Sequence, residues 1–403
     1  MTDSKRTVFC FSMLATLAIP SAVLAADWPN WRGPQLDGIS QETDWSPRFE
    51  RGARAVSWTK HVGIGYSTVS VRDGRAYTTG WENGDETLYC LDAETGQTKW
   101  SHTRGIERYD RLHEGGSGGT PAVSGGMVVY VNRNGELLCL KVIDGKVVWK
   151  TSLAEQLGVD RPHFGFAGSP VIVDESVYVD LGFIVKLDLE SGEVRWKTKN
   201  YKPAYSTPVP FAYENESLLA CFPEFGLVLL NADNGTERAS VRWKTEHGIN
   251  AATPVVSHNR FFISSGYNTG GAVFEWDRNG LHPVWENHEI HNHMASCVLI
   301  DGYLYGFDES VLKCVDFKTG KQAWSQRGLG KGSLSAANGK LIVLSEKGEL
   351  LIARAYADGF TEVSRMKVLD GDQNWVVPVL ANGRIYCRSP RGKLVCVDVS
   401  LED

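Results

Sequence analysis

Short stretches of alternating apolar and polar residues run along most of the chain, separated by turns that end in glycine. Residues 88–100, 137–149, 185–196 and 311–324 each contain such a stretch, a glycine turn, and a second stretch that ends in Trp. Alternation with a period of two is typical of a β-strand with one buried face. Glycine suits the positive φ that a tight hairpin turn requires. Each of these segments is therefore predicted to be a β-hairpin.

A second hairpin pattern precedes the first in each unit, as in residues 120–131, 169–179 and 377–386. One unit thus comprises four short antiparallel strands, which is the composition of a propeller blade. The tryptophans that end the units lie 39 to 49 residues apart, within the range of four-stranded blades. These tryptophans are Trp58, Trp100, Trp149, Trp196, Trp243, Trp285 and Trp324.

Counting the units predicts an all-β, eight-bladed β-propeller of four-stranded antiparallel blades. The last unit, Val376 to Val399, has only three strands, and Phe360–Met366 is a degenerate outer strand of the unit before it. Ala53–Trp58 has no earlier strands of its own, so it is expected to supply the missing outer strand and close the ring. Closure removes the open sheet edge that a linear array would leave. An open stack of sheets, or two separate sandwiches, is the alternative.

The first 25 residues have the layout of a secretory signal peptide. Lys5 and Arg6 precede an apolar run over residues 8–19, and small residues before Ala25 suit cleavage. A buried N-terminal helix is the alternative. The mature protein is then expected to be periplasmic or secreted, with the propeller over residues 53–403. Residues 26–52 lack strand periodicity and are expected to pack on the propeller as an extended segment, using Trp28, Trp31 and Trp45.

Helix content is expected to be low. The capping-box pattern from Ser152 to Glu155 predicts one short helix that ends at Leu157. Beyond the signal peptide, the sequence has no second long apolar run, so no transmembrane segment is expected.

Charge and cysteine usage narrow the function classes. The chain has 42 Lys and Arg against 48 Asp and Glu, a net charge of -6, which argues against nucleic acid or an anionic membrane as partner. Seven of the eight cysteines lie beyond the signal peptide, an odd number that does not suit a disulfide framework. Four of them, Cys90, Cys139, Cys314 and Cys396, occupy one repeated strand position, which favours small buried apolar side chains.

The repeat itself resembles that of the pyrroloquinoline-quinone-like (PQQ-like) propeller family. Residues 90–100 and 314–324 match the family pattern Ala-x-Asp-x-x-Thr-Gly-x-x-x-Trp with Cys in place of Ala, and residues 186–196 match it from the Asp onward with Ser in place of Thr. In this family the tryptophan docks against the peptide plane of the neighbouring glycine. The resemblance therefore implies a structural docking role for the seven repeated tryptophans and suggests an exported bacterial member of the family.

The family includes quinoprotein dehydrogenases and non-enzymatic scaffolds. The resemblance implies that an enzyme would hold calcium with Glu, Asn and Asp, and would often carry a disulfide between adjacent cysteines, a pair absent here. The predicted starts of the first strands, which form one mouth of the channel, contain no Asp or Glu and only one Lys. We therefore expect a non-catalytic binding or scaffold propeller without a cofactor. A PQQ-dependent alcohol or sugar dehydrogenase with PQQ and calcium is the alternative, with loop carboxylates such as Glu224 or Asp110 as ligands.

Long or polar side chains stand among small residues at this predicted channel mouth. Lys331 offers a positive charge and Trp375 a stacking surface, a combination that suits a small planar anion or a protein partner. The alternative is that these side chains only plug the channel. The residues predicted to bind at the mouth are Tyr66, Tyr205, Asn250, His293, Lys331 and Trp375.

Three histidines form the pattern His-x-x-His-x-His at His288, His291 and His293. Strand alternation would place His291 and His293 on one face, and imidazoles suit Zn²⁺ or Cu²⁺. No cysteine or helical spacing supports a metal site, so a polar loop with one histidine facing the channel is favoured.

Overall fold

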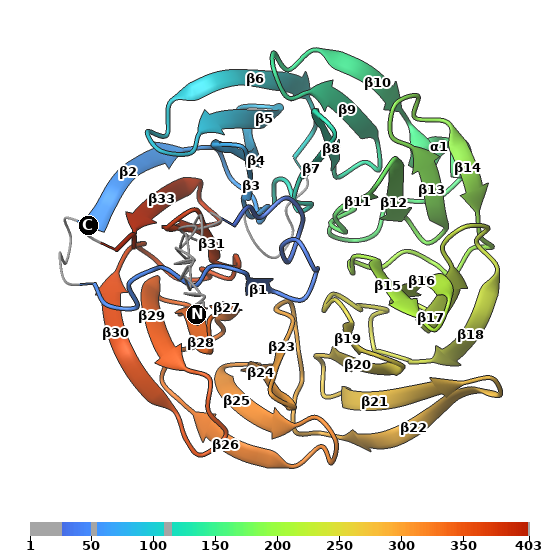
Figure 1. The fold of residues 1–403 in the computed structure, drawn as a ribbon. Helices are drawn as coiled ribbons and strands as arrows, with labels where there is room; N and C mark the ends of the chain where they lie inside the picture. Colours follow the sequence, from blue (N-terminus) through green and yellow to red (C-terminus); the bar gives the residue numbers. More distant parts are fainter. Residues whose placement is uncertain (1–25, 50–54, 109–114, 402–403) are drawn as a thin grey trace, which may run out of the picture.

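Eight blades of four antiparallel strands each form a closed ring in the computed structural model, which describes residues 26–49, 55–108 and 115–401, and one short extra strand joins the seventh blade (Figure 1). The prediction of an all-β, eight-bladed propeller is confirmed. The first four blades contain β3 (Ser70–Arg72), β4 (Arg75–Glu82), β5 (Asp85–Asp92) and β6 (Thr98–Gly105); β7 (Ala122–Ser124), β8 (Met127–Val131), β9 (Leu137–Lys141) and β10 (Val147–Thr151); β11 (Val171–Val173), β12 (Ser176–Asp180), β13 (Ile184–Asp188) and β14 (Val194–Lys197); and β15 (Val209–Tyr213), β16 (Glu216–Cys221), β17 (Gly226–Asn231) and β18 (Glu237–Arg242).

The other four blades follow in chain order. They contain β19 (Val255–Ser257), β20 (Arg260–Ser265), β21 (Gly270–Asp277) and β22 (Gly280–Asn287); β23 (Val298–Ile300), β24 (Tyr303–Asp308), β25 (Val311–Asp316) and β26 (Gln322–Gln326); β27 (Ser333–Ala337), β28 (Lys340–Leu344), β29 (Glu349–Arg354) and β30 (Thr361–Lys367); and β31 (Val379–Ala381), β32 (Arg384–Arg388) and β33 (Lys393–Asp398), completed by β2 (Val56–His61).

The ring is closed by the N-terminal strand β2, which pairs antiparallel with β33 as the outer strand of blade 8. Residue 53, where this strand was expected to begin, lies outside the described residues. Trp58 reaches across to blade 1, where its Nε1 donates to the carbonyl of Ala93 at 3.2 Å. Gly96 has a φ of +71°, and a Cβ there would come within 2.6 Å of the Trp58 ring. Only glycine therefore fits both this turn and this docking contact.

Four further tryptophans dock on a glycine of the next blade in the same way: Trp100 on Gly145, Trp149 on Gly192, Trp196 on Gly235, and Trp285 on Gly320. Trp324 keeps only the hydrogen bond, from its Nε1 to the carbonyl of Tyr356 at 2.7 Å. Trp243 differs, because Ala239 occupies the position opposite Leu229 that tryptophan holds in six of the other seven blades. Its Nε1 instead donates to the Ser265 hydroxyl at 3.2 Å. Docking of the indole ring on a glycine, which the resemblance implies for all seven tryptophans, is therefore seen at five of them and not at Trp243 or Trp324.

The N-terminal segment, residues 26–49, crosses the centre of the ring (Figure 1). The amide of Trp28 donates to the carbonyl of Val71 at 2.8 Å, and the amide of Val123 donates to the carbonyl of Pro29 at 2.9 Å. Further along, β1 (Ile39–Ser40) pairs parallel with β27. These contacts lie beyond the predicted mouth residues along the first strands, so the segment covers the opposite end of the channel.

The short helix α1 (Leu153–Leu157) forms as predicted, but Ser152 makes no capping hydrogen bond with its side chain. The seven cysteines beyond the signal peptide are all buried and free, in agreement with their interpretation as small apolar side chains. The predicted signal peptide lies outside the described residues and stays a prediction. Within the described ranges, no helix has the length and apolar character needed to cross a membrane.

Candidate functional site

A cavity of about 360 Å³ lies inside the ring at the starts of the first strands. We call it the central cavity. Its polar lining includes His293 and Arg133, and its remaining walls are largely small residues. Trp31 of the N-terminal segment belongs to this lining and is held by a hydrogen bond from its Nε1 to the Thr253 hydroxyl at 2.9 Å. The aromatic side chains of the lining are Trp31, Tyr66, Phe164, Tyr205, Tyr267 and Trp375.

Four of the six residues predicted at the mouth line this cavity: Tyr66, Tyr205, His293 and Trp375. Tyr66 and Trp375 stack with ring centroids 6.0 Å apart and an interplanar angle of 18°. The Tyr205 hydroxyl accepts a hydrogen bond from the amide of Phe164 at 3.3 Å. The structure thus brings aromatic faces from blades far apart in the sequence to one place. Their role in binding stays a prediction.

Lys331 lies beside the cavity, in a small recess that it shares with His293 and Trp375. Its ammonium is 2.7 Å from the Glu309 carboxylate and donates to His293 Nδ1 at 2.8 Å. Nδ1 accepts this bond, so the proton of a neutral His293 is on Nε2. Glu309 therefore already compensates the positive charge that Lys331 was predicted to offer, and a planar anion at this mouth stays a prediction.

Asn250 does not face the central cavity. Its side chain is fully buried, donates to the carbonyl of Pro223 at 2.8 Å, and accepts from the Ser265 hydroxyl at 2.8 Å. Both ends of the amide are thus committed to the protein itself. The sequence predicted Asn250 at the start of a first strand, but β19 begins at Val255, and the neighbours Ile249 and Ala251 are the residues that line the cavity.

Charged residues also reach the mouth from hairpin loops between second and third strands, and the sequence patterns did not reveal them. Arg133 lies between β8 and β9, Glu309 between β24 and β25, and Glu346 between β28 and β29. Glu346 accepts from the Trp375 indole at 3.3 Å and from the Lys331 amide at 3.2 Å. In a four-stranded antiparallel blade these loops lie at the same end as the start of the first strand. That topological rule was the signal available in the sequence.

The carboxylates near the mouth do not fit a calcium ion. Calcium prefers six to eight oxygen ligands, usually several of them carboxylates. Here Glu309 and Glu346 already pair with Lys331 and Trp375, and Glu224 lies 3.4 Å from Lys202. Across the part of the chain that the structure describes, no three residues among His, Cys, Asp and Glu are placed to share a metal. Asp110 lies outside that part.

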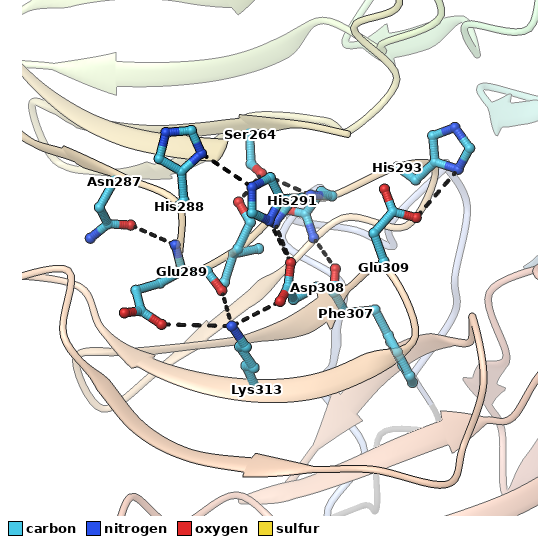
Figure 2. A network of polar contacts seen from close by, with 12 residues as sticks. Ser264, Asn287, His288, Glu289, His291, His293, Phe307, Asp308, Glu309 and Lys313 are labelled. Carbon is cyan, nitrogen blue, oxygen red and sulfur yellow. Dashed lines mark hydrogen bonds and ion pairs between the residues drawn. The ribbon is translucent and has the colours of Figure 1, made fainter. Parts of the chain in front are cut away.

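The structure places His293 of the sequence motif apart from His288 and His291 (Figure 2). His291 is mostly buried and its Nδ1 lies 2.6 Å from Asp308, whereas His293 turns to the central cavity. The expected pairing of His291 with His293 on one face does not occur; His288 is instead the neighbour of His291, with ring nitrogens 3.3 Å apart. One histidine facing the channel was the favoured reading, and His293 takes that place.

Asp308 is a negatively charged side chain that contacts both His291 and Lys313. Burial raises the pKa of Asp308, but hydrogen bonds from Lys313 and His291 outweigh it and hold the pKa below its usual value. The Lys313 ammonium is 2.8 Å from Asp308 and also donates to the carbonyl of Glu289 at 2.7 Å. The loop before β23 is therefore tied to β24 and β25 through charged groups.

Glu86 is a fully buried carboxylate close to the cavity wall. Its Oε1 accepts from the Ser117 hydroxyl at 2.5 Å. Burial raises its pKa from 4.5 to about 7, despite the opposing effects of Ser117 and Arg133. The folded protein therefore holds this proton over a pH range in which the unfolded chain has lost it.

We expect this proton to make stability fall as pH rises. Between pH 4.5 and about 7 the folded state binds more protons than the unfolded chain, so the free energy of unfolding decreases with pH. A shift of this size corresponds to about 3 kcal/mol. Glu86→Gln should remove this cost and unfold at higher urea concentration than the parent at pH 8, but not at pH 4.5. Exposed Glu190→Gln is the control, and parallel pH profiles of parent and Glu86→Gln would contradict the prediction.

Fold, repeat and cavity together define an eight-bladed propeller with PQQ-like repeats. The chain belongs to the family described as outer membrane protein assembly factor BamB, whose model matches residues 84–326. A curated relative, outer membrane protein assembly factor BamB of Yersinia pestis, is 24% identical over 280 residues. The match covers 65% of this chain and 65% of that relative's length.

Solved structures with the same fold include enzymes. Quinohemoprotein alcohol dehydrogenase from Comamonas testosteroni has a TM-score of 0.65 and 13% identity, covering 94% of this chain and 81% of that one. A europium-containing methanol dehydrogenase has a TM-score of 0.64 and 10% identity, covering 92% and 89%. At these identities the likeness concerns the fold alone. The resemblance to the PQQ-like propeller family, expected from the repeats, is confirmed.

Proposed function

We propose that the protein is an exported, non-catalytic binding propeller that works in the periplasm as an assembly scaffold for outer-membrane proteins. Membership in the BamB family and the signal-peptide pattern at Lys5 and Arg6 support this proposal. The partner we propose is a protein segment rich in aromatic and apolar side chains, bound in the central cavity.

The observation that carries the proposal is the composition of the cavity. Six of its lining side chains are aromatic, and apolar surface removed from water is the main source of affinity for such a segment. The charged groups described at its mouth already contact one another: Lys331 pairs with Glu309, and Glu346 with Trp375. Such a site favours apolar contacts over charge recognition.

The test is a calorimetric titration with a ten-residue synthetic peptide that alternates Phe or Tyr with Ser. A peptide with Ala in place of each aromatic residue is the matched ligand control. Trp375→Ala and Tyr66→Ala should each weaken binding at least about tenfold, which is 1.4 kcal/mol. Tyr356→Ala, an exposed aromatic on another part of the ring, should leave the affinity unchanged. If both cavity variants stay within about 0.5 kcal/mol of the parent, the cavity is not the site.

A periplasmic PQQ-dependent dehydrogenase is the second candidate, because the stacked Tyr66 and Trp375 offer a planar surface inside an enclosed space. The carboxylates that calcium would need are already paired, as described above, so the mouth fits the quinone ring better than its metal ion. Titration with PQQ and Ca²⁺, followed by absorbance and thermal shift, separates the two candidates. Saturable binding with quinone absorbance would overturn the non-catalytic assignment.

A further inference from the structure

The loop between β22 and β23 places two imidazoles side by side. His288 Nδ1 and His291 Nε2 are 3.3 Å apart, and the rings are tilted by 35° (Figure 2). His288 is exposed, whereas His291 is mostly buried. The pair therefore has one side open to solvent and one side fixed in the protein.

The separation of these two nitrogens matches a tetrahedral metal ion. Zinc binds imidazole nitrogens at about 2.0–2.1 Å, and two such ligands at the tetrahedral angle stand about 3.3–3.4 Å apart. Neutral imidazole is a good ligand for Zn²⁺ and for the other late first-row ions. The two rings thus stand at the spacing that a shared ion requires.

The buried ring is also oriented as a metal ligand. His291 Nδ1 lies 2.6 Å from Asp308, so this nitrogen carries the proton and donates it to the carboxylate. In the neutral ring Nε2 then has its lone pair directed at His288. A carboxylate that holds the remote nitrogen of a ligating histidine is a recurrent partner of zinc sites and raises the basicity of the ligand.

Asp308 is itself held in place by two further contacts. Its Oδ2 is 2.8 Å from the Lys313 ammonium, and its Oδ1 also accepts from the His291 amide at 3.1 Å. The carboxylate therefore cannot turn toward the two imidazoles without losing an ion pair and a hydrogen bond. It acts on the site through His291.

We propose that His288 and His291 bind a single Zn²⁺ ion, with Asp308 as the positioning residue and water in the remaining coordination positions. Within the described residues no third His, Cys, Asp or Glu completes the site. The ion therefore keeps open positions on the solvent side. It would replace the hydrogen bond between the two rings by two metal–nitrogen bonds. This inference does not depend on the proposed function.

The site is tested with tag-free protein, because an affinity tag of histidines would bind the same ion. Calorimetric titration with ZnCl₂ should show saturable binding of one ion per chain. X-ray absorption at the zinc edge should show two imidazole nitrogens at about 2.0–2.1 Å. His288→Ala and His291→Ala should each abolish this binding, and Asp308→Asn should weaken it by about 10- to 100-fold.

Two histidines of similar setting serve as controls. His293→Ala removes the third histidine of the same motif, and His282→Ala removes an exposed histidine that lies 3.1 Å from Asp277. Neither change should alter zinc binding. Melting temperatures without metal establish that each variant is folded, and Asp308→Gln is the second variant if Asp308→Asn is not. The proposal is overturned if the parent shows no saturable binding, or if the folded His288→Ala variant binds zinc like the parent.

Discussion

A chain that begins at Val62 should melt at a markedly lower temperature than one that begins at Ala55, and it should aggregate. Both truncations remove the N-terminal segment, but only the shorter chain lacks β2. Without β2, the outer edge of β33 is left unpaired, and such an edge is a template for association with another chain. The contact of Trp58 with Gly96 is lost as well, and removal of a buried Trp typically costs about 3–5 kcal/mol.

Differential scanning calorimetry and light scattering measure the two effects on the pair of truncations. A synthetic peptide covering residues 55–62, added to the shorter chain, should raise its melting temperature because it restores the missing strand. The decrease in melting temperature caused by Trp58→Ala in the full chain measures the contribution of the docking contact alone. Equal melting temperatures for the two truncations would show that β2 does not hold the ring closed.

Replacing Arg388 by Met should destabilise the protein by at least about 3 kcal/mol, because three buried carbonyl oxygens lose their donor at about 1–3 kcal/mol each. Arg388 ends β32 in blade 8, and its guanidinium is buried against blade 1. It donates to the carbonyls of Ser67 at 2.7 Å, Thr79 at 2.6 Å and Gly63 at 3.0 Å. Burial lowers the pKa of Arg388 from 12.5 to about 9, so the group remains charged at neutral pH.

Urea unfolding at pH 7 measures the effect. Methionine keeps most of the apolar stem, so the comparison isolates the loss of hydrogen bonds. The free energy of unfolding of Arg388→Lys should lie between those of Arg388→Met and the parent, since one ammonium cannot make all the hydrogen bonds of the planar guanidinium. The exposed Arg327→Met is the control and should stay within about 0.5 kcal/mol. A folded Arg388→Met protein with unchanged stability would contradict a clamp between the last blade and the first.

The fold was predictable because its information is local and repeated. Each blade carries its own alternation and turn glycine, and the missing fourth strand of the last unit pointed to closure by the N-terminus. Register inside a strand was not predictable from spacing. Trp243 lies at the expected interval, yet Ala239 takes the docking position, four residues earlier.

The candidate site was predictable only in part. First-strand starts located Tyr66, Tyr205, His293 and Trp375 at the cavity, because that rule follows from topology. Glu309 and Glu346 lie in loops between second and third strands. The ion pair of Lys331 with Glu309 was therefore not predictable from the first-strand starts. Strand alternation would place His291 and His293 on one face, but the loop before β23 has no strand geometry, and a bend at residues 288–289 brings His288 to His291 instead.

The closure of the ring by its two ends also sets the order of folding. Val56 pairs with Val397, almost the whole length of the chain away. A chain that is synthesised or exported from its N-terminus exposes β2 while every blade before the last one forms. The strands of each earlier blade are close in sequence, so these blades can form early, whereas contacts between residues so far apart in sequence form late. The final pairing therefore acts as a completion step, and until it occurs both ends remain open to chaperones, proteases or a second copy.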